Sequence, residues 1–283
     1  MTTAQFEVDF KNKLKNIYDD REASNISDWV FENITGLKRL QRRHDQSTLS
    51  NTQKVQLENY LEELLHSKPV QYVLKEACFY KRKFFVNEDT LIPRPETEEL
   101  VGWVIHDSKE TQKNKIQIID IGTGSGCIPV SLKLELPDAL IDAVDISEKA
   151  ILVARENSKE LQADVNFLRL DFLQDTEWPS LGKYDVIISN PPYIPITEKK
   201  TLSKNVADFE PEIALFVENN DPFIFYKKIV EFAQQHLTKD GKIYVEIHEE
   251  YTSDVKNIFE NAGFITTIRK DIYGKERMVR ARI

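Results

Sequence analysis

The stretch that decides the fold reads Asp120-Ile121-Gly122-Thr123-Gly124-Ser125-Gly126. It follows an apolar, strand-like run and leads into a helical segment that begins near Cys127. Glycine at three alternating positions lets the backbone turn sharply and pass close to a ligand, because no Cβ is in the way. Strand, glycine-rich turn and helix in this order predict the first βα unit of a ligand-binding α/β domain.

Strand-like and helical segments alternate from this point to the C-terminus. Such alternation predicts an α/β domain with a doubly wound, mostly parallel sheet covered by helices on both faces. Seven strand-like runs give the expected strands: Ile116–Ile121, Leu140–Val144, Val165–Leu168, Tyr184–Ile188, Lys242–Ile247, Phe264–Arg269 and Met278–Ile283.

The first part of the chain, residues 1–75, has a different pattern. Its apolar residues recur at helical spacing, and Gly36 is its only glycine. Ser50 followed by Gln53 predicts a capping box that opens one of its helices. We therefore expect a small N-terminal helical bundle.

Residues 76–92 separate the two parts. Aromatic and β-branched residues alternate there with basic and polar ones, which predicts a β-hairpin linker. Pro95 suits the first turn of the helix that follows, and Glu96 and Glu98 suit its positive end. The expected catalytic domain therefore covers residues 93–283.

The spacing of the glycines indicates the type of ligand. Dinucleotide-binding loops read G-x-G-x-x-G and face a pyrophosphate. Here the glycines Gly122, Gly124 and Gly126 read G-x-G-x-G after the acidic Asp120. Such a loop alone is also compatible with an ordinary tight turn. The acid favours S-adenosylmethionine, whose amino-acid tail carries a positively charged amine, and we expect Thr123 and Ser125 in the same loop to contribute.

Two further acidic residues end neighbouring strands. Asp145 is placed to accept hydrogen bonds from both ribose hydroxyls. The alternative is an aspartate that caps the next helix, but Ser147 can already fill that role. Asp171 could accept from the adenine amino group, and the Phe172 ring could pack on the base. Together with the glycine loop, these residues predict an adenosyl cofactor site.

The motif Asn190-Pro191-Pro192-Tyr193 stands at the carboxyl end of the fourth strand, where ligands bind in open α/β sheets. The prolines fix the backbone and remove two N–H donors. The Asn190 side-chain oxygen and the Pro191 carbonyl can then accept both hydrogens of an NH₂ group. Two such acceptors would hold a planar amide or amino nitrogen in line with the methyl group. Tyr193 could pack on the flat substrate group. The alternative is a Pro-Pro turn that only ends a strand.

Composition restricts the other functions. The formal net charge is −9 and the pI about 5.3, whereas a protein that binds nucleic acid through phosphates needs surplus Lys and Arg. No apolar run approaches the roughly 20 residues of a membrane span, and no signal pattern opens the sequence, so we expect a cytoplasmic protein. We expect no metal site, because the cysteines and histidines lack ligand spacing: Cys78, Cys127, His44, His66, His106, His236 and His248.

Over essentially its whole length, the chain resembles the bacterial protein-(glutamine) methyltransferases that modify peptide chain release factors. Pro69-Val70-Gln71-Tyr72 and the segment Thr90–Glu98 carry this resemblance most specifically, because the glycine loop and Asn190–Tyr193 also occur in DNA and RNA amino-methyltransferases. Phe209-Glu210-Pro211 matches as well. The resemblance implies that the target is the glutamine of a Gly-Gly-Gln loop, that the N-terminal domain helps to grip the release factor, and that Arg94 and Glu210 bind substrate.

Two departures and two alternatives accompany this interpretation. Lys75 and Lys81 stand where the family commonly has glycine, and both lie around the linker. A DNA or RNA amino-methyltransferase would share the catalytic motif, but the acidic charge balance and the helical N-terminal part disfavour direct nucleic-acid binding. A non-catalytic adaptor with an adenosyl pocket would have no need of Asn190–Tyr193.

Overall fold

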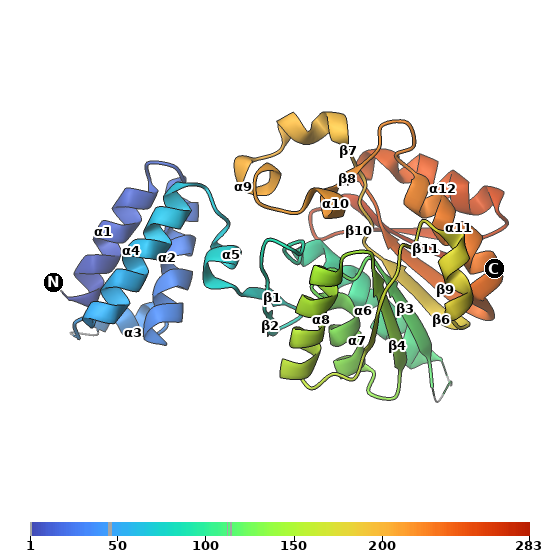
Figure 1. The fold of residues 1–283 in the computed structure, drawn as a ribbon, viewed down its shortest axis with the longest axis horizontal. Coiled ribbons are helices and arrows are strands. Elements are labelled where there is room, and N and C mark those ends of the chain that lie inside the picture. The colour runs from blue at the N-terminus through green and yellow to red at the C-terminus, as the bar shows by residue number, and fades with distance from the viewer. Residues whose placement is uncertain (1, 45–46, 112, 114) are drawn as a thin grey trace. The chain divides into compact units, whose positions relative to one another are not determined.

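The computed structural model of the chain describes residues 2–44, 47–111, 113 and 115–283 (Figure 1). The chain forms two compact units. The helical unit comprises Met1–Glu76 and Ser203–Phe209, and the catalytic unit comprises Ala77–Leu202 and Glu210–Ile283. The sequence-based division placed residues 203–209 in the catalytic domain. The structure groups them with the helices, and α9 lies within this segment.

The helical unit is built from amphipathic helices. Its core consists of side chains such as Phe10, Val30, Phe31 and Leu57, each at most 1% exposed. The predicted capping box of Ser50 is confirmed, since its hydroxyl accepts from the backbone of the third helical residue and that residue's side chain accepts from Ser50 N–H. The helices are α1 (Thr3–Leu14), α2 (Asp20–Thr35), α3 (Arg39–His44), α4 (Asn51–Leu65) and α5 (Val70–Leu74), with α9 (Lys204–Ala207) from the later segment.

A buried ion cluster joins three helices of this unit. The Arg42 guanidinium on α3 is 1% exposed and donates to both carboxylate oxygens of Glu7 at 3.0 and 2.9 Å. It also donates to Asp28 at 2.8 Å and to the Leu37 carbonyl at 2.7 Å. The buried guanidinium therefore has charged partners on two other helices, and the cluster ties α1, α2 and α3 together.

The linker hairpin is shorter than the predicted range. Strands β1 (Ala77–Phe79) and β2 (Arg82–Phe84) pair antiparallel through a two-residue turn at Tyr80 and Lys81. Both turn residues have positive φ, 46° and 65°, which is the conformation of a type I′ turn. Lys75 also has positive φ, 54°, where it ends α5. Glycine adopts such angles without a steric cost, which explains why the family commonly has glycine at Lys75 and Lys81.

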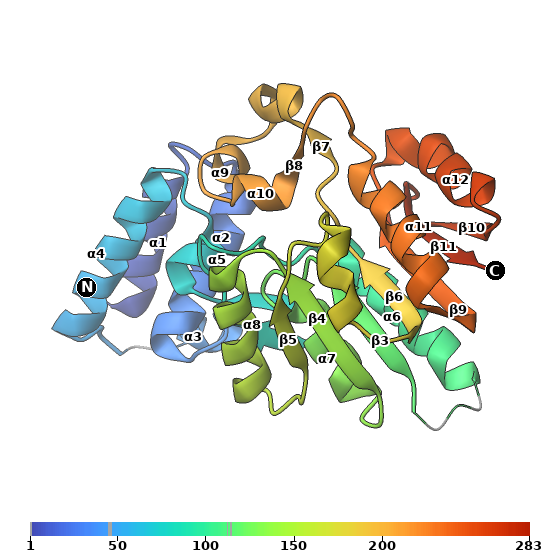
Figure 2. The same ribbon diagram turned by 45° about the vertical axis from the view of Figure 1, so that its right-hand side comes forward.

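The predicted α/β sheet is confirmed, and the described residues give it seven strands in the order β10-β11-β9-β6-β3-β4-β5 (Figures 1 and 2). Strands β9, β6, β3, β4 and β5 run parallel, whereas the C-terminal β11 is antiparallel to both of its neighbours. The strands are β3 (Gln117–Ile121), β4 (Leu140–Asp145), β5 (Asn166–Arg169), β6 (Tyr184–Ser189), β9 (Leu237–Glu246), β10 (Ile265–Lys270) and β11 (Glu276–Arg282).

Helices cover both faces of the sheet, as the doubly wound pattern predicted. Because strand side chains alternate in direction, Ile118 packs in one core cluster and Ile119 in the other. The first cluster contains side chains of α6 (Pro95–Glu110), α7 (Cys127–Glu135) and α8 (Glu148–Glu160), and the second contains those of α11 (Ile224–His236) and α12 (Thr252–Asn261). Pro95 stands at the start of α6 with Glu96 and Glu98 in its first turn, as expected.

Short elements complete the catalytic unit. Strand β7 (Ile194–Pro195) pairs parallel with β8 (Phe216–Val217) just after the Asn190–Tyr193 motif, and this small sheet was not predicted. No helix in the described part of the chain is long and apolar enough to cross a membrane. The remaining elements are α10 (Glu212–Leu215) and the 3-10 helices η1 (Asp175–Ser180), η2 (Ile196–Thr201) and η3 (Glu249–Tyr251).

Candidate active site

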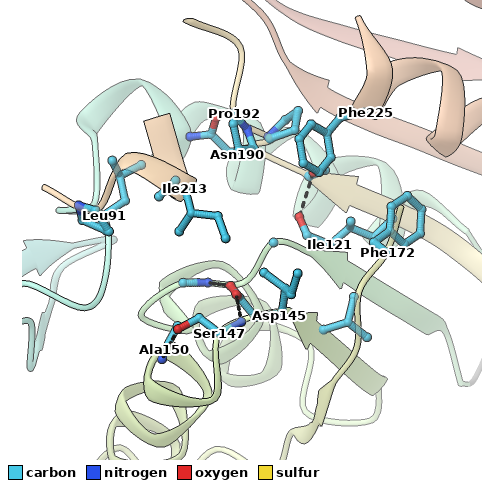
Figure 3. Close-up of a pocket in the computed structure, with 18 of the residues that line it drawn as sticks. Leu91, Ile121, Asp145, Ser147, Ala150, Phe172, Asn190, Pro192, Ile213 and Phe225 are labelled. Atoms are coloured by element: carbon cyan, nitrogen blue, oxygen red, sulfur yellow. Dashed lines mark hydrogen bonds between the residues drawn. The ribbon is translucent and has the colours of Figure 1, made fainter. Parts of the chain in front are cut away.

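A cavity of about 170 Å³ lies at the carboxyl ends of β3, β4 and β6. Figure 3 shows Asp145 and Ser147 on one side of it and Asn190 and Pro192 on the opposite side. This is the edge where open α/β sheets bind ligands. Of the residues predicted from the sequence, the cavity lining includes Gly122, Gly124, Asp145, Asp171, Phe172, Asn190, Pro191 and Pro192.

The glycine loop has the conformation that its sequence required. Gly122, Gly124 and Gly126 all have positive φ, at 76°, 54° and 77°. A Cβ on Gly126 would lie 2.9 Å from the Cβ of Ala154, so this glycine also permits close packing of the loop on α8. At Gly124 a Cβ would project into open space. The loop therefore forms a bare backbone wall that leaves room for a ligand.

A buried asparagine anchors the loop from behind. Asn157 on α8 is 2% exposed, and its Nδ2 donates to the Ser125 carbonyl at 2.9 Å. The same side chain donates to the Phe85 carbonyl at 2.9 Å and accepts from the Phe85 N–H at 2.7 Å. Asn157 thus ties the glycine loop to the segment after the hairpin, and no sequence motif indicated this role.

Asp120 is fully buried, and among the described residues neither of its carboxylate oxygens has a hydrogen-bond partner. Its pKa is raised to about 7, mainly by burial and to a smaller extent by the negative charge of Asp145, whereas the nearby Thr123 hydroxyl acts in the opposite direction without reaching hydrogen-bond geometry. The buried Thr123 and Ser125 hydroxyls also have no partner among the described residues. Unsatisfied buried polar atoms are costly, so this group fits a site that a cationic ligand completes.

Asp145 at the end of β4 shapes the loop as well as the cavity. One of its oxygens accepts from the Gly124 N–H at 2.8 Å and the other from the Ser147 N–H at 2.9 Å. Each oxygen keeps further acceptor capacity. Burial raises the pKa of Asp145, and these backbone hydrogen bonds oppose the rise. Ser147 caps α8 by accepting from the Ala150 N–H, so Asp145 is not needed as the helix cap.

Asp171, the third acidic residue, lines the cavity, but its carboxylate also forms a local hydrogen bond. The Asp171 carboxylate accepts from the Leu173 N–H at 3.1 Å, which fixes the turn after β5. Phe172 lines the cavity, but its buried ring also packs against Trp178 and Phe232 at centroid distances of 5.5 and 5.3 Å. Phe172 therefore contributes an apolar wall that is held by the core.

The Asn190 side chain is oriented by a hydrogen bond. Its Nδ2 donates to the Thr97 hydroxyl at 3.1 Å, and Thr97 in turn donates to Glu246 at 2.6 Å. The Asn190 Oδ1 atom is thereby left as an acceptor on a residue that lines the cavity. Ser189, just before the motif, donates to the Ile121 carbonyl at 2.7 Å and joins β6 to the glycine-loop strand.

The other members of the motif divide between two environments. Pro191 and Pro192 line the cavity. The half-buried Tyr193 packs instead against His248, with ring centroids 6.0 Å apart. Burial raises the pKa of Tyr193 well above its ordinary value, so its hydroxyl stays neutral. Contact of this ring with a substrate remains a prediction.

Arg94 and Glu210, which the resemblance places at the substrate, bind each other. Arg94 donates to Glu210 at 2.6 Å, and the second Glu210 oxygen accepts from the Ile92 N–H at 3.1 Å. Glu210 is 4% exposed. With both oxygens used, its carboxylate clamps the segment before α6 to the segment before α10. That clamp holds two cavity walls, at Leu91 and Ile213.

Three hydrophobic cavity residues were not predicted as site residues from the sequence. Leu91, Ile213 and Phe225 line the cavity (Figure 3), yet each is an ordinary apolar residue in the sequence. Thr97 and Glu246 were missed for another reason. They are separated by 149 positions, and only the fold shows that they meet.

One group of possible metal ligands occurs among the described residues, formed by His106, Asp107 and Glu110 on α6. Asp107 is already engaged, because it accepts from Tyr244 at 2.6 Å and from Arg280 at 2.7 Å. Burial favours its neutral form, but these hydrogen bonds keep its pKa below the ordinary value. None of these three residues lines the cavity beside the glycine loop.

Comparison with solved structures confirms the fold. The catalytic domain of hMettl16, solved in complex with hairpin 6 of the MAT2A 3′UTR, matches with a TM-score of 0.54 and 16% identity over 82% of each chain. A methyltransferase from Pyrococcus furiosus matches with a TM-score of 0.50 and 16% identity, covering 79% of this chain and 98% of that one. At such low identity, the likeness concerns the fold alone.

Comparison of sequences reaches further. Residues 107–208 match the model of the Methyltransferase small domain family. A release factor glutamine methyltransferase of Flavobacterium psychrophilum is 40% identical over 99% of both chains. Another, from Bacteroides thetaiotaomicron, is 39% identical over 96% of both chains. With identity at this level over nearly full length, and with the glycine loop and Asn190–Pro192 around one cavity, the chain belongs to the release factor glutamine methyltransferase family.

Proposed function

We propose that this protein transfers a methyl group from S-adenosylmethionine to the side-chain amide nitrogen of the glutamine in the Gly-Gly-Gln loop of peptide chain release factors. The observation that carries the proposal is that one cavity is lined by the bare backbone of the glycine loop, by Asp145 and by Asn190. This lining supports a cofactor on the glycine-loop side and an NH₂ group near Asn190 and Pro191. The reaction belongs to translation termination, which places it in the cytoplasm.

The residues around the cavity fit S-adenosylmethionine. We assign the cofactor's amine to the surroundings of Asp120, whose buried carboxylate has no partner among the described residues. We assign the ribose hydroxyls to Asp145, and the adenine to the apolar wall near Phe172 with Asp171 at its edge. Asn190 would border the cofactor on the remaining side. S-Adenosylmethionine supplies an electrophilic methyl group on its sulfonium.

The residues of the motif address the weak nucleophilicity of an amide. The lone pair of an amide nitrogen is delocalised into its carbonyl, so orientation and charge stabilisation matter more than a general base. Asn190 Oδ1 and the Pro191 carbonyl would accept the two N–H groups and fix the nitrogen in one direction. As positive charge develops on that nitrogen, both oxygens stabilise it, and they do so without reorganisation because their positions are already set.

The helical unit supplies a surface for a protein partner. Trp29 on α2 is 47% exposed and borders a cavity of about 200 Å³ that Tyr18, Gln71 and Asn205 also line. A half-exposed tryptophan beside a hollow is the kind of residue that dominates protein interfaces. We infer that this surface contacts the release factor. Asn205 belongs to the segment that the structure adds to the helical unit, so both parts of that unit take part.

The test is methyl incorporation from labelled S-adenosylmethionine. Purified release factor, a variant of it with the loop glutamine replaced by alanine, DNA and RNA would be compared as acceptors across a salt series. We expect incorporation into the intact release factor alone, with moderate salt dependence, since nucleic-acid binding weakens much more steeply with salt. Preferential methylation of DNA or RNA would overturn the proposal, and so would full incorporation into the glutamine-less release factor.

A further inference from the structure

Three side chains form a buried chain of hydrogen bonds that ends at the cavity. Glu246 lies at the end of β9, Thr97 in the first turn of α6, and Asn190 after β6. Glu246 and Thr97 are each 3% exposed. Thr97 donates its hydroxyl hydrogen to Glu246 at 2.6 Å and accepts from Asn190 Nδ2 at 3.1 Å.

The direction of this chain follows from the number of hydrogens. A hydroxyl has one hydrogen, and a carboxylate can only accept. Ionised Glu246 therefore takes the single hydrogen of Thr97, which leaves the Thr97 oxygen only as an acceptor. The amide of Asn190 then has to present its NH₂ to Thr97. If that amide were rotated by half a turn, two acceptors would face each other and a buried hydrogen bond would be lost.

We propose that Thr97 and Glu246 are positioning residues that fix the orientation of the Asn190 amide, so that its Oδ1 is free to accept from the substrate nitrogen. The inference rests on the proposed function, because it assigns Oδ1 to the reacting NH₂. Thr97 and Glu246 act through Asn190 and do not line the cavity. This chain of hydrogen bonds gives the buried Glu246, which does not line the cavity, a role in the site.

Protonation of Glu246 would reverse the direction of the hydrogen bonds from Asn190 through Thr97 to Glu246. Burial raises its pKa to about 7; Thr97 opposes this rise, Glu96 adds to it, and Arg277 and Arg94 lower it. Two tyrosines also face this group, and both keep their protons: Tyr193, whose pKa burial and Glu246 raise, and Tyr226, which donates to the Glu246 carbonyl at 3.0 Å. A protonated Glu246 donates to Thr97, and Thr97 can then donate to Asn190 Oδ1, which the substrate needs.

The test compares Thr97→Val, Thr97→Ser and Glu246→Gln with the wild type in release-factor methylation. Thr97→Val removes the hydroxyl at constant size, and we expect kcat to fall on the order of 10- to 100-fold, because a misdirected group costs about that much. KM for S-adenosylmethionine should stay within about threefold. Thr97→Ser restores the hydroxyl and should restore kcat to within about threefold. Thr252→Val, which removes a buried hydroxyl bonded to the Glu249 carbonyl, is the matched control and should leave kcat unchanged.

The pH profile supplies a readout that a merely structural role would not move. In the wild type kcat should decline as the pH falls through the pKa of Glu246, since the deprotonated form sets the direction of the hydrogen bonds through Thr97. Glu246→Gln cannot ionise, so its profile should lose this acid limb. A profile of Glu246→Gln that keeps the limb would overturn the role of Glu246. Thr97→Val leaves the buried Glu246 carboxylate without its donor, which can destabilise the fold. If that variant folds poorly, the double variant Thr97→Val/Glu246→Leu replaces it in the kcat measurement, because it removes both polar partners.

Nuclear magnetic resonance of the Asn190 side-chain amide separates this inference from the proposed function. The NH₂ signals, assigned by their loss in Asn190→Ala, should shift and broaden in Thr97→Val and return in Thr97→Ser. Unchanged signals together with unchanged kcat would overturn the positioning role. A wild-type enzyme that leaves release factor unmethylated would overturn the proposed function, and the resonance measurement would still decide whether Thr97 orients Asn190.

Discussion

The two units of this protein differ in how their buried charges are partnered. In the helical unit, the buried Arg42 is paired with the partly exposed Glu7 and Asp28. The catalytic unit has a paired buried carboxylate of this kind in Glu210, but among the described residues its Asp120 is buried without a partner, and the Glu246 side chain accepts from the neutral Thr97 hydroxyl. Paired charges hold a structure together, whereas unsatisfied ones are retained where a ligand or a reaction needs them.

The same contrast applies to the backbone. In the catalytic unit, glycine occupies every second position from Gly122 to Gly126, and all three glycines have positive φ. The helical unit has Gly36, which ends α2 in the left-handed conformation, as helices commonly end. On the proposed function, we expect chemistry to depend on a few constrained residues of the catalytic unit and recognition of the partner to depend on the surface of the helical unit. Substitutions in the two units should therefore differ both in the size of their effect and in which step they affect.

The largest effect is expected at Asn190. Asn190→Ala removes one of the two acceptors that we propose for the reacting nitrogen, and loss of one preorganised group of this kind lowers turnover about 10²- to 10³-fold. The affinity for S-adenosylmethionine should change much less, because the loss is greatest in the transition state. Steady-state methylation of release factor and calorimetric titration with the cofactor measure the two quantities. Asn219→Ala is the control, since Asn219 binds Thr197 away from the cavity. Near-normal turnover of Asn190→Ala would mean that Asn190 only shapes the turn.

Asp145 should affect binding instead of turnover. Asp145→Ala removes the two charge-assisted hydrogen bonds that we propose to ribose, each worth about 1.5–3 kcal/mol. The lower limit, about 3 kcal/mol, corresponds to a Kd for S-adenosylmethionine roughly a hundredfold higher. Asp142→Asn is a control on the same strand, because Asp142 binds Tyr184 and Asn166. Calorimetry decides the matter, and an unchanged Kd would remove Asp145 from the site.

The pKa of Asp145 gives this prediction a second readout. Burial raises that pKa, so the ionised form that accepts from ribose is lost at a higher pH than for an exposed aspartate. Cofactor affinity should therefore begin to fall on acidification above the ordinary aspartate range. The Asp145→Ala variant should lose this contribution to the pH dependence, which the same titrations repeated at several pH values would detect.

The recognition surface should show a smaller effect that depends on the substrate. Trp29→Ala should lower kcat/KM for intact release factor about tenfold, the size expected of an interface residue worth over 1 kcal/mol. The affinity for cofactor should not change. Leu40→Ala is the matched control, because Leu40 is 72% exposed in the same unit but lies outside the cavity beside Trp29. Equal activity of Trp29→Ala and Leu40→Ala would place the partner surface elsewhere.

Sequence reasoning succeeded where the requirement was local. The glycine spacing predicted the loop, the apolar run Ile116–Ile121 predicted a strand, and Ser50 with Gln53 predicted a cap. In each case the residues that interact lie within a few positions of one another, so their pattern contains the physical constraint.

It failed where the contact depends on the fold. Thr97 and Glu246 meet across 149 positions, and Arg94 reaches Glu210 across 116, so neither pair leaves a signature in spacing. The resemblance implies that Arg94 and Glu210 bind substrate, which stays a prediction, whereas their mutual ion pair left no signal in the sequence. Residues 203–209, expected in the catalytic domain, group with the helical unit, and four residues of helix carry too little periodicity to show which core they join.

The smallest predicted effect concerns the linker, where this chain departs from its family. Lys81 occupies a type I′ turn position at φ 65°, and a left-handed conformation costs a residue with a Cβ roughly 1–2 kcal/mol. Glycine avoids this cost in the folded state, but its greater conformational entropy stabilises the unfolded chain. The first effect is the larger, so Lys81→Gly should raise the free energy of unfolding by about 0.5 kcal/mol. Lys83→Gly is the control, since Lys83 lies in β2, where glycine weakens a strand, and that variant should lower the stability. Chemical denaturation measures both, and methylation should be unchanged because Lys81 does not line the cavity. A Lys81→Gly variant less stable than the wild type would show that the lysine side chain makes a compensating interaction.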